Sequence, residues 1–425
     1  MLVEFRVANF RSIHEEQVLS FVASNDKTAA KTHLMDAGIK GVSQLTRTAV
    51  IYGPNASGKS SILSALAYLQ QVVLQSANLQ PGASFNAQPF KLSKASVKQP
   101  SRFEITFVLD GARHQYGFSI SAERIVDEWL LVYRTAKPQQ WFNRVWNEKT
   151  QVHDYEFSPH LTGTRKVWQE ATRANALFLS TAVQLNSELL RPVLNWMTSR
   201  ILFFAAGQHL SHDYTTELLK TDDGRNMVSA FLSAADTGIV AVQAMSRKTL
   251  RRTYKLDMAI SGPAPVLNEE VETFTPIFSH TADPDLPSFE LQDESQGTQR
   301  LYALAAPVLD ALANGWMLVV DELDSSLHSY LVKHIVQMFH NPAINTKGAQ
   351  LLFSTHDTSL LGEDVFRRDQ IWFTEKDQSG ATRLYPFSDF SPRKAEAWER
   401  GYLAGRYGAV PLLRSEPAVP SKIAA

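Results

Sequence analysis

The sequence contains no cysteine, which excludes disulfide bonds and thiolate metal sites among its 425 residues. It also lacks any apolar run of about 20 residues, the length that a membrane-spanning helix needs. The charges within Met1–Arg6 come too early for a secretory signal. We therefore expect a soluble, cytoplasmic protein with no membrane partner.

An excess of charge of either sign is also missing. Lys and Arg (42) nearly balance Asp and Glu (43), so nucleic-acid contact would require a local basic patch. Hydrophobic residues make up 44% of the chain and charged residues 20%, a composition typical of folded globular proteins. The length exceeds that of one compact core, and there is no internal repeat, so we expect a main domain with a sizeable insertion.

What the sequence does contain is a phosphate-loop motif, Gly-x4-Gly-Lys-Ser, between a short apolar run at 48–52 and a helical pattern after residue 60. In such a loop, backbone N–H groups and a helix N-terminus surround phosphates. The predicted nucleotide-binding residues are Gly53, Pro54, Asn55, Ala56, Ser57, Gly58, Lys59, Ser60 and Ser61. Lys59 should reach the β- and γ-phosphates, and Ser60 should ligate Mg²⁺. The plainer alternative is a glycine-rich turn.

Asp321 and Glu322 follow the apolar run Trp316–Val320, which predicts a buried strand. Carboxylates at such a strand end lie at the edge of a parallel sheet where ligands bind. Asp321 is the predicted Mg²⁺ ligand, and Glu322 is the predicted general base that polarises water. The alternative is that both cap the next helix.

Two further segments complete the pattern. Ser295 and Gly297 precede a helical stretch and could bind a γ-phosphate, although such a serine is usually a helix N-cap. His356 follows a second apolar run and is predicted to contact the γ-phosphate, with a structural histidine as the alternative. This motif order is typical of ABC-type ATPases, in which the signature of one subunit faces the nucleotide of another. It predicts ATP and Mg²⁺ as cofactors and a homodimer, or higher homo-oligomer, formed through ATP.

The expected fold is α/β, with an ABC-type P-loop core whose mostly parallel sheet is flanked by helices. We predict a core lobe at 1–95, an antiparallel β region at 96–150, a mainly helical insertion at 151–287, the remaining core at 288–413 and a disordered tail at 414–425.

Within the insertion, Arg165–Trp196 and Arg225–Tyr254 have helical periodicity. The cations of Arg247–Lys255 would then share one helical face, which could bind phosphates or an acidic partner, although a solvated face is favoured. Gln88 is a candidate for a glutamine that couples the lobes, but a structural role is favoured.

The motifs together resemble the ABC-type AAA ATPases of prokaryotic abortive-infection systems, most closely the RloA- and AbiL-type ATPases, with OLD-family ATPases as more distant relatives. The resemblance rests on Gly53–Ser60, Glu294–Arg300, Asp321–His328 and Ser354–Asp357. Two C-terminal segments are also similar, Arg367–Asp377 and Gly405–Pro411.

The resemblance implies an anti-phage ATPase that regulates a separately encoded toxic effector, such as a Toprim-type or other nuclease. OLD proteins carry a fused nuclease, but fewer than 70 residues follow His356 here, so we expect no nuclease activity in this chain. The signature also departs from the Ser-Gly-Gly-Gln of transporters, so only Ser295 and Gly297 are carried over. The alternative function is a DNA-repair or DNA-clamp ATPase resembling RecF and SMC proteins.

Overall fold

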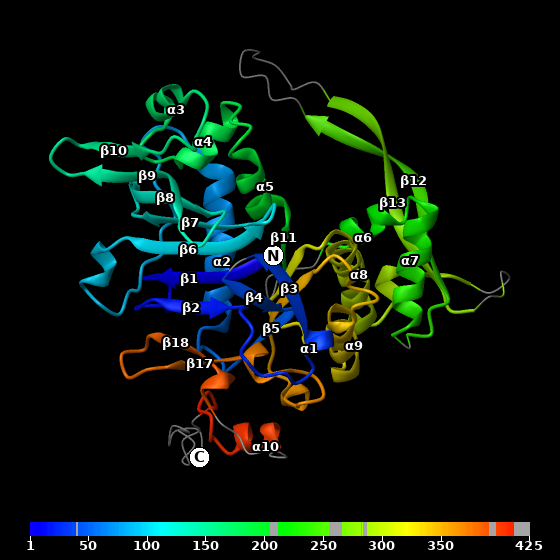
Figure 1. The fold of residues 1–425 in the computed structure, drawn as a ribbon. Helices are drawn as coiled ribbons and strands as arrows, with labels where there is room; N and C mark the ends of the chain where they lie inside the picture. The colour runs from blue at the N-terminus through cyan, green and yellow to red at the C-terminus, as the bar shows by residue number, and fades with distance from the viewer. Residues whose placement is uncertain are drawn as a thin grey trace, which may run out of the picture. The chain divides into compact units, whose positions relative to one another are not determined.

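The computed structural model describes residues 1–39, 41–204, 211–235, 237–254, 266–281, 283, 287–390 and 397–411. The predicted tail at 414–425 lies outside these residues. The chain divides into two compact units (Figure 1). The first comprises Met1–Ala206, Leu312–Asp324 and Val336–Ala425, and the second comprises Gly207–Ala311 and Ser325–Ile335. Within the described ranges, no helix has the length and hydropathy to span a bilayer.

A six-stranded sheet forms the core of the first unit. Its order is β11 (Ile201–Phe204), β15 (Met317–Val320), β16 (Gln350–Ser354), β5 (Thr48–Tyr52), β17 (Ile371–Lys376) and β18 (Thr382–Pro386). The first five strands are parallel and β18 is antiparallel. Every residue of β5, β15 and β16 is buried, as expected for continuous apolar strands covered on both faces. The predicted α/β core is confirmed.

An antiparallel sheet of seven strands forms the other layer of this unit. Its order is β10 (Val152–Phe157), β9 (Gln139–Asn147), β8 (Ile125–Tyr133), β7 (Ala112–Ile120), β6 (Ser101–Leu109), β1 (Leu2–Ala8) and β2 (Gln17–Ser20). Asp110 and Gly111 connect β6 to β7 with φ of 50° and 70°, the left-handed pair that a tight hairpin needs. The sheet therefore extends beyond the predicted 96–150 region, because it also contains β1 and β2 before it and β10 after it. A small hairpin, β3 (Leu34–Ile39) and β4 (Val42–Thr46), follows helix α1 (Ala30–His33).

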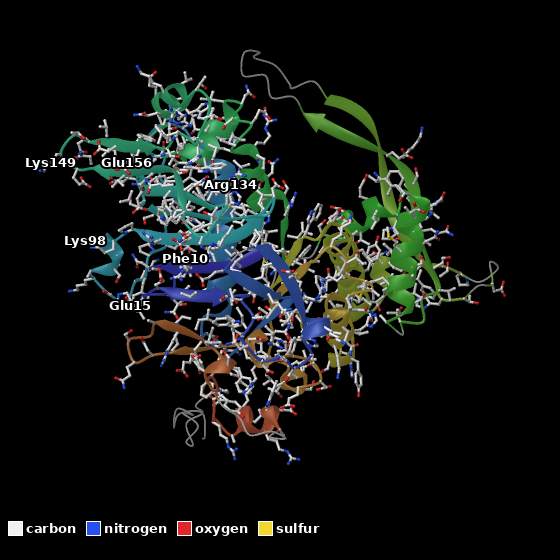
Figure 2. All side chains as sticks on the ribbon, in the orientation of Figure 1. Phe10, Glu15, Lys98, Arg134, Lys149 and Glu156 are labelled. Carbon is white, nitrogen blue, oxygen red and sulfur yellow. The ribbon has the colours of Figure 1, made fainter. Side chains whose placement is uncertain are left out.

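Helix α2 (Lys59–Gln75) joins the phosphate loop to the apolar core, because Ile62, Leu66 and Leu69 lie on its buried face. Phe10, labelled in Figure 2, packs with its ring centroid 5.4 Å from that of Tyr68 on α2. The turn after β1 is thereby anchored on the helix that follows the phosphate loop.

The stretch Arg165–Trp196 forms three short helices, α3 (Arg165–Ala171), α4 (Phe178–Gln184) and α5 (Arg191–Ser199). The buried carboxylate of Glu128 accepts hydrogen bonds from the N–H groups of Phe178 (2.6 Å) and Leu179 (3.0 Å) at the start of α4. Burial raises the pKa of Glu128, and the adjacent Arg144 opposes this shift. These contacts fix α4 on strand β8.

The second unit contains α6 (Asp213–Leu218), α7 (Asp222–Ser233), most of α8 (Gln296–Asn314) and a sheet of β12 (Ala241–Tyr254), β13 (Val266–Ser279) and β14 (Phe289–Glu290). Helix α9 (Ser329–His340) crosses the boundary between the units. The predicted helix over Arg225–Tyr254 is wrong beyond α7, because 241–254 is a strand paired with 266–279. Pairing with a distant strand satisfies the backbone, and it overrides the weak helical preference of Arg and Lys.

The basic run therefore does not share a helical face. The register places Lys248 opposite Glu272 and Arg251 opposite Glu269. Arg247 also forms an ion pair with Glu290, with 2.9 Å between Nη2 and Oε1. In the part of the basic run whose side chains are described, Arg247 and Lys248 thus have acidic neighbours on β14 and β13, unlike the uniformly basic surface that binds phosphates. Lys255 lies outside the described residues.

Candidate nucleotide site

Three of the four predicted segments meet at one edge of the parallel sheet. The phosphate loop follows β5, His356 follows β16, and Asp321 and Glu322 follow β15. Strand β16 pairs with both β5 and β15, so the carboxyl ends of the three strands are adjacent. This is the edge at which open α/β sheets bind ligands.

Two glycines give the phosphate loop its close contacts. A Cβ atom at Gly53 would collide with the carbonyl oxygen of Thr374, and one at Gly58 would collide with the side chain of Thr382. Gly58 also has φ of 113°, a left-handed conformation that favours glycine. Ala56 adopts φ of 63°. The motif glycines are therefore required by both the space and the backbone conformation.

The loop is held by contacts that the sequence did not predict. The hydroxyl of Ser57 lies 2.6 Å from that of Thr374 on β17, and the hydroxyl of Thr382 on β18 donates to the Ser57 carbonyl at 2.9 Å. Ser12 donates to the hydroxyl of Ser61 at 2.8 Å and lies 2.8 Å from that of Thr382. Threonine is common in strands, so nothing in the sequence pointed to this role.

Lys59 turns back over the loop. Its Nζ atom donates to the carbonyl oxygens of Gly53 (2.8 Å) and Pro54 (3.3 Å). Burial lowers the pKa of Lys59, and Asp321 and Glu322 oppose this shift. The charge of Lys59 therefore interacts with those of the predicted Mg²⁺ ligand and the predicted general base. The adjacent Ser60 is exposed in the first turn of α2.

Ser354 connects Asp321 and Glu322 to the neighbouring strand. Its buried hydroxyl donates to Oδ1 of Asp321 and accepts from the N–H of Glu322 at 2.8 Å. Glu322 has φ of 52°, a left-handed conformation that is costly for this residue type. Such strain persists where the surroundings impose it, which is common at functional sites. Ser354 was part of a predicted motif, but the sequence did not predict this contact.

His356 is exposed, and its N–H donates to Oδ2 of Asp324 at 3.1 Å. Oδ1 of the same carboxylate is buried and has no hydrogen-bond partner. Asp324 therefore links the segment after β15 to the start of the His356 loop. Asp321, Glu322, Asp324 and His356 thus form one connected group in the first unit.

The fourth segment belongs to the second unit. The hydroxyl of Ser295 accepts from the N–H of Thr298 at 3.1 Å, so Ser295 caps the first turn of α8. A Cβ atom at Gly297 would lie 2.9 Å from the carbonyl oxygen of Ser326, so glycine permits a close backbone approach there.

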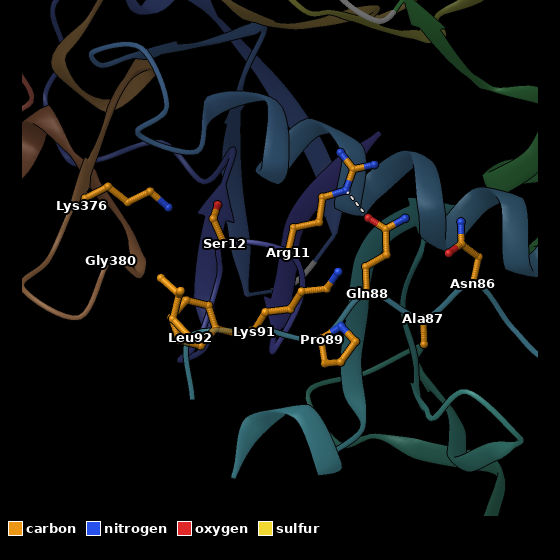
Figure 3. Close-up of a pocket in the computed structure, with 11 residues that line it drawn as sticks. Arg11, Ser12, Asn86, Ala87, Gln88, Pro89, Lys91, Leu92, Lys376 and Gly380 are labelled. Carbon is orange, nitrogen blue, oxygen red and sulfur yellow. Dashed lines mark hydrogen bonds between the residues drawn. The ribbon is translucent and has the colours of Figure 1, made fainter. Parts of the chain in front are cut away.

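A cavity of about 620 Å³ opens beside Ser12 (Figure 3). Three cations, Arg11, Lys91 and Lys376, line it, and none of its lining residues is acidic. Arg11 donates through Nε to the side-chain oxygen of Gln88 at 2.9 Å. The cavity therefore favours an anionic ligand, and Gln88 supports Arg11 there.

A larger cavity of about 880 Å³ lies at the other end of the loop, beside Gly53, Pro54 and Asn55. It is also lined by His356 and by Tyr402, Val410 and Pro411 of the C-terminal segment. Lys376 lines both cavities. The cavity beside Ser12 is thus cationic, whereas the cavity beside Gly53 combines charged and polar side chains with apolar ones of the C-terminal segment.

The residues fit a nucleotide with Mg²⁺. The loop glycines admit close backbone approach, and a lysine, an exposed serine hydroxyl and a buried carboxylate accompany them. Within the described part of the chain there is no cluster of three or more His, Asp or Glu side chains suited to a metal. Mg²⁺ at phosphates needs no such cluster, because water and phosphate oxygens supply most of its ligands.

Comparison with known proteins identifies a family. A family model described as "AAA domain, putative AbiEii toxin, Type IV TA system" matches residues 49–362, which is more than half of the chain. No curated protein sequence matches.

Among solved structures, the chain is similar to an Smc head bound to the C-winged helix domain of ScpA. The identity is 14%, over 93% of this chain and 98% of that chain, with a TM-score of 0.40. It is also similar to an Smc head domain with an extended coiled coil, bound to the C-terminal domain of ScpA derived from Pyrococcus furiosus. Here the identity is 12%, over 91% of this chain and 96% of that chain, also with a TM-score of 0.40. Similarity at this level carries no information about function.

Proposed function

The chain belongs to the AAA-domain family that matches residues 49–362, and we propose that it is an Mg²⁺-dependent ATPase. The observation that carries this proposal is the meeting of three motifs at one sheet edge, with Lys59 close to the carboxylates of Asp321 and Glu322. A glycine-rich turn without a nucleotide role would need neither the lysine nor the carboxylates.

In this proposal, Gly53–Ser61 surround the phosphates of ATP, and Lys59 places its charge at the β- and γ-phosphates. Arg11 and Lys376, which line the cationic cavity beside Ser12, supply further positive charge to the phosphates. Ser60 and Asp321 would hold Mg²⁺, which would neutralise charge that develops on the phosphates. Glu322 accepts a proton from the attacking water, and His356 contacts the terminal phosphate.

We further propose that the site is completed by a second copy of the chain. Ser295 and Gly297 would contact the γ-phosphate held by the partner, through the N-terminus of α8. ATP would then hold a homodimer together, and hydrolysis would release it. This assignment rests on the motif order and on the fit of Ser295 at a helix N-terminus.

The cellular role that we propose is anti-phage defence by regulation of a separate toxic effector, such as a Toprim-type nuclease. The description of the family names a toxin of a type IV toxin–antitoxin system. The resemblance to RloA- and AbiL-type ATPases supports the same role. The corrected hairpin weakens the alternative of a DNA clamp, because Lys248 lies opposite Glu272 and Arg247 forms an ion pair with Glu290.

Replacement of the predicted base tests the ATPase proposal. Glu322→Gln should bind ATP but lose hydrolysis by about a thousandfold, because the amide cannot accept the proton. Phosphate release and ATP binding should be measured on the same preparation. Hydrolysis near the wild-type rate in this variant would falsify the assignment of Glu322.

Phage challenge tests the cellular role. Cells that carry the chain and its neighbouring genes should resist phage, and resistance should be lost either with Glu322→Gln or when the effector gene is deleted. The purified chain should show no nuclease activity with Mg²⁺ or Mn²⁺. Full protection without any neighbouring gene would contradict the proposed effector.

A further inference from the structure

The segment Gly405–Pro411 resembles a family motif but has no part in the function proposed so far. It follows helix α10 (Trp398–Leu403) and turns back beside β17. The ring of Tyr402 stacks on Phe373 of β17, with centroids 5.4 Å apart and planes 10° apart. The Tyr402 hydroxyl donates to the carbonyl of Ala409 at 2.7 Å. The helix and the turn are thus joined on the strand next to the phosphate-loop strand.

Glu375, near the end of β17, holds the other side of this turn. Its Oε2 atom accepts from the N–H of Ala409 at 3.3 Å and from the hydroxyl of Tyr385 at 3.1 Å. Burial raises the pKa of Tyr385, and the charge of Glu375 adds to the shift, so the hydroxyl remains a donor. The same hydroxyl lies 2.9 Å from the carbonyl oxygen of Tyr407. Glu375 therefore holds the turn directly at Ala409 and, through Tyr385, at Tyr407.

Gly408 permits this arrangement. It has φ of 67°, and a Cβ atom there would lie 2.6 Å from both Oε2 of Glu375 and the hydroxyl of Tyr385. Any side chain would push the turn away from the carboxylate. The motif glycine is therefore explained by the contact with Glu375 and by its backbone conformation.

The turn presents its apolar end to the phosphate loop. Val410 and Pro411 line the 880 Å³ cavity together with Pro54 and His356. A second contact holds helix α10 in place. The hydroxyl of Thr358 donates to the carboxylate of Glu399 on this helix at 3.0 Å. The C-terminal segment is thus fixed to β17 and also to the loop that carries His356.

We propose that the Gly405–Pro411 turn is a fixed wall of the nucleotide pocket at the terminal-phosphate end, and that Glu375 is the residue that positions it. This inference rests on the proposed ATPase function. Apolar side chains at this wall exclude bulk water from the space beside His356, which strengthens the electrostatic contacts made there. The loop itself still binds the phosphates when the wall is displaced, so the wall should affect turnover more than binding.

The kinetic test compares four variants. Glu375→Ala and Gly408→Ala should each lower kcat roughly tenfold and leave KM for ATP within about twofold. Glu375→Gln should retain most of the activity, because its amide oxygen accepts the same two hydrogen bonds. Gly111→Ala is the matched control, because Gly111 has φ of 70° in the β6–β7 turn and no atom within 4 Å of an added Cβ. Its activity should match the wild type.

Photolabelling tests the location. ATP with an aryl azide on its γ-phosphate should label the 402–411 peptide, and Lys59→Ala should prevent this labelling. The wall proposal is overturned if the label lies elsewhere, or if Glu375→Ala and Gly408→Ala behave like Gly111→Ala. Either outcome would leave the ATPase proposal intact, provided that the wild type still hydrolyses ATP and Lys59→Ala does not. Failure of the wild type to bind or hydrolyse ATP would instead overturn the proposed function, and the wall proposal with it.

Discussion

The two units of the chain hold their predicted functional groups in different ways. In the first unit, the carboxylates and the histidine are held by contacts between segments that follow different strands, as Ser354 joins β16 to Asp321 and Glu322. In the second unit, Ser295 bonds to Thr298 of the helix that it caps. The first unit thus contains a connected nucleotide site, whereas the signature turn is a locally capped helix end. This difference is what we expect if the partner of the signature lies on a second copy of the chain.

The largest expected effect tests that difference directly. Lys59→Ala and Ser295→Arg should each abolish hydrolysis, because one removes the phosphate-binding charge and the other blocks the signature. An equal mixture should recover roughly a quarter of the wild-type rate, because half of the dimers are mixed and each has one intact composite site. Steady-state phosphate release by the mixture measures this recovery.

Subunit exchange must be shown in the same experiment, for example by energy transfer between labelled chains. Ser295→Arg alone should still bind ATP. If the chains exchange and the mixture stays inactive, the signature does not act across two copies.

An intermediate effect tests the contacts within the first unit. Ser354→Ala should lower kcat by roughly 10- to 100-fold. The variant removes the hydrogen bond to the Asp321 carboxylate and the one from the N–H of Glu322, so both residues lose their positioning. The matched control is Ser180→Ala, which removes another buried hydroxyl, one that donates to the Val73 carbonyl at 2.6 Å. The control should lose stability without losing turnover per folded molecule. Equal kcat values for the two variants would show that Ser354 does not position the carboxylates.

The smallest expected effect concerns how the free energy of unfolding depends on pH through His340, which is buried next to β5. His340 lies 2.8 Å from the hydroxyl of Thr48 on β5, and burial lowers its pKa well below 6.5, with His33 and Arg47 adding to the shift. Below pH 6.5, His340 is protonated in the unfolded chain but stays neutral in the folded protein. The free energy of unfolding should therefore fall with decreasing pH, by at most about 1.4 kcal/mol per unit from this group.

Denaturant titrations between pH 7.5 and about 5 should detect this dependence. His340→Gln should show a shallower loss of stability over that range, whereas the exposed control His160→Gln should follow the wild type. A slope in His340→Gln as steep as that of the wild type would exclude this histidine as a source of the pH dependence.

Much of the first unit could be predicted from local sequence. The phosphate loop, the strand before Asp321 and the strand before His356 are short patterns in which residue type and order report directly on backbone conformation. Their meeting at one sheet edge followed from the rule that the carboxyl ends of parallel strands align. The antiparallel region at 96–150 was also predicted, because alternation and a hairpin turn such as Asp110–Gly111 are local signals.

The hairpin of β12 and β13 shows where this reasoning failed. The residues of 241–254 have no strong strand alternation, and their Arg and Lys residues are compatible with a helix. Their conformation is decided by a partner strand that begins at Val266, and local propensity is too weak to oppose such pairing. A search for acidic residues at matching positions further along the chain would have pointed to the hairpin.

The sequence by itself determined which residues are candidates for phosphate, metal and proton chemistry, because those roles depend on side-chain type and short spacing. Only the tertiary structure decided what holds them. Thr374 and Thr382 contact the phosphate loop from more than 300 positions away, and Glu375 contacts Ala409 across the end of β17. Such contacts depend on which strands lie side by side, and strand order is set by the packing of the whole sheet, which no short segment encodes.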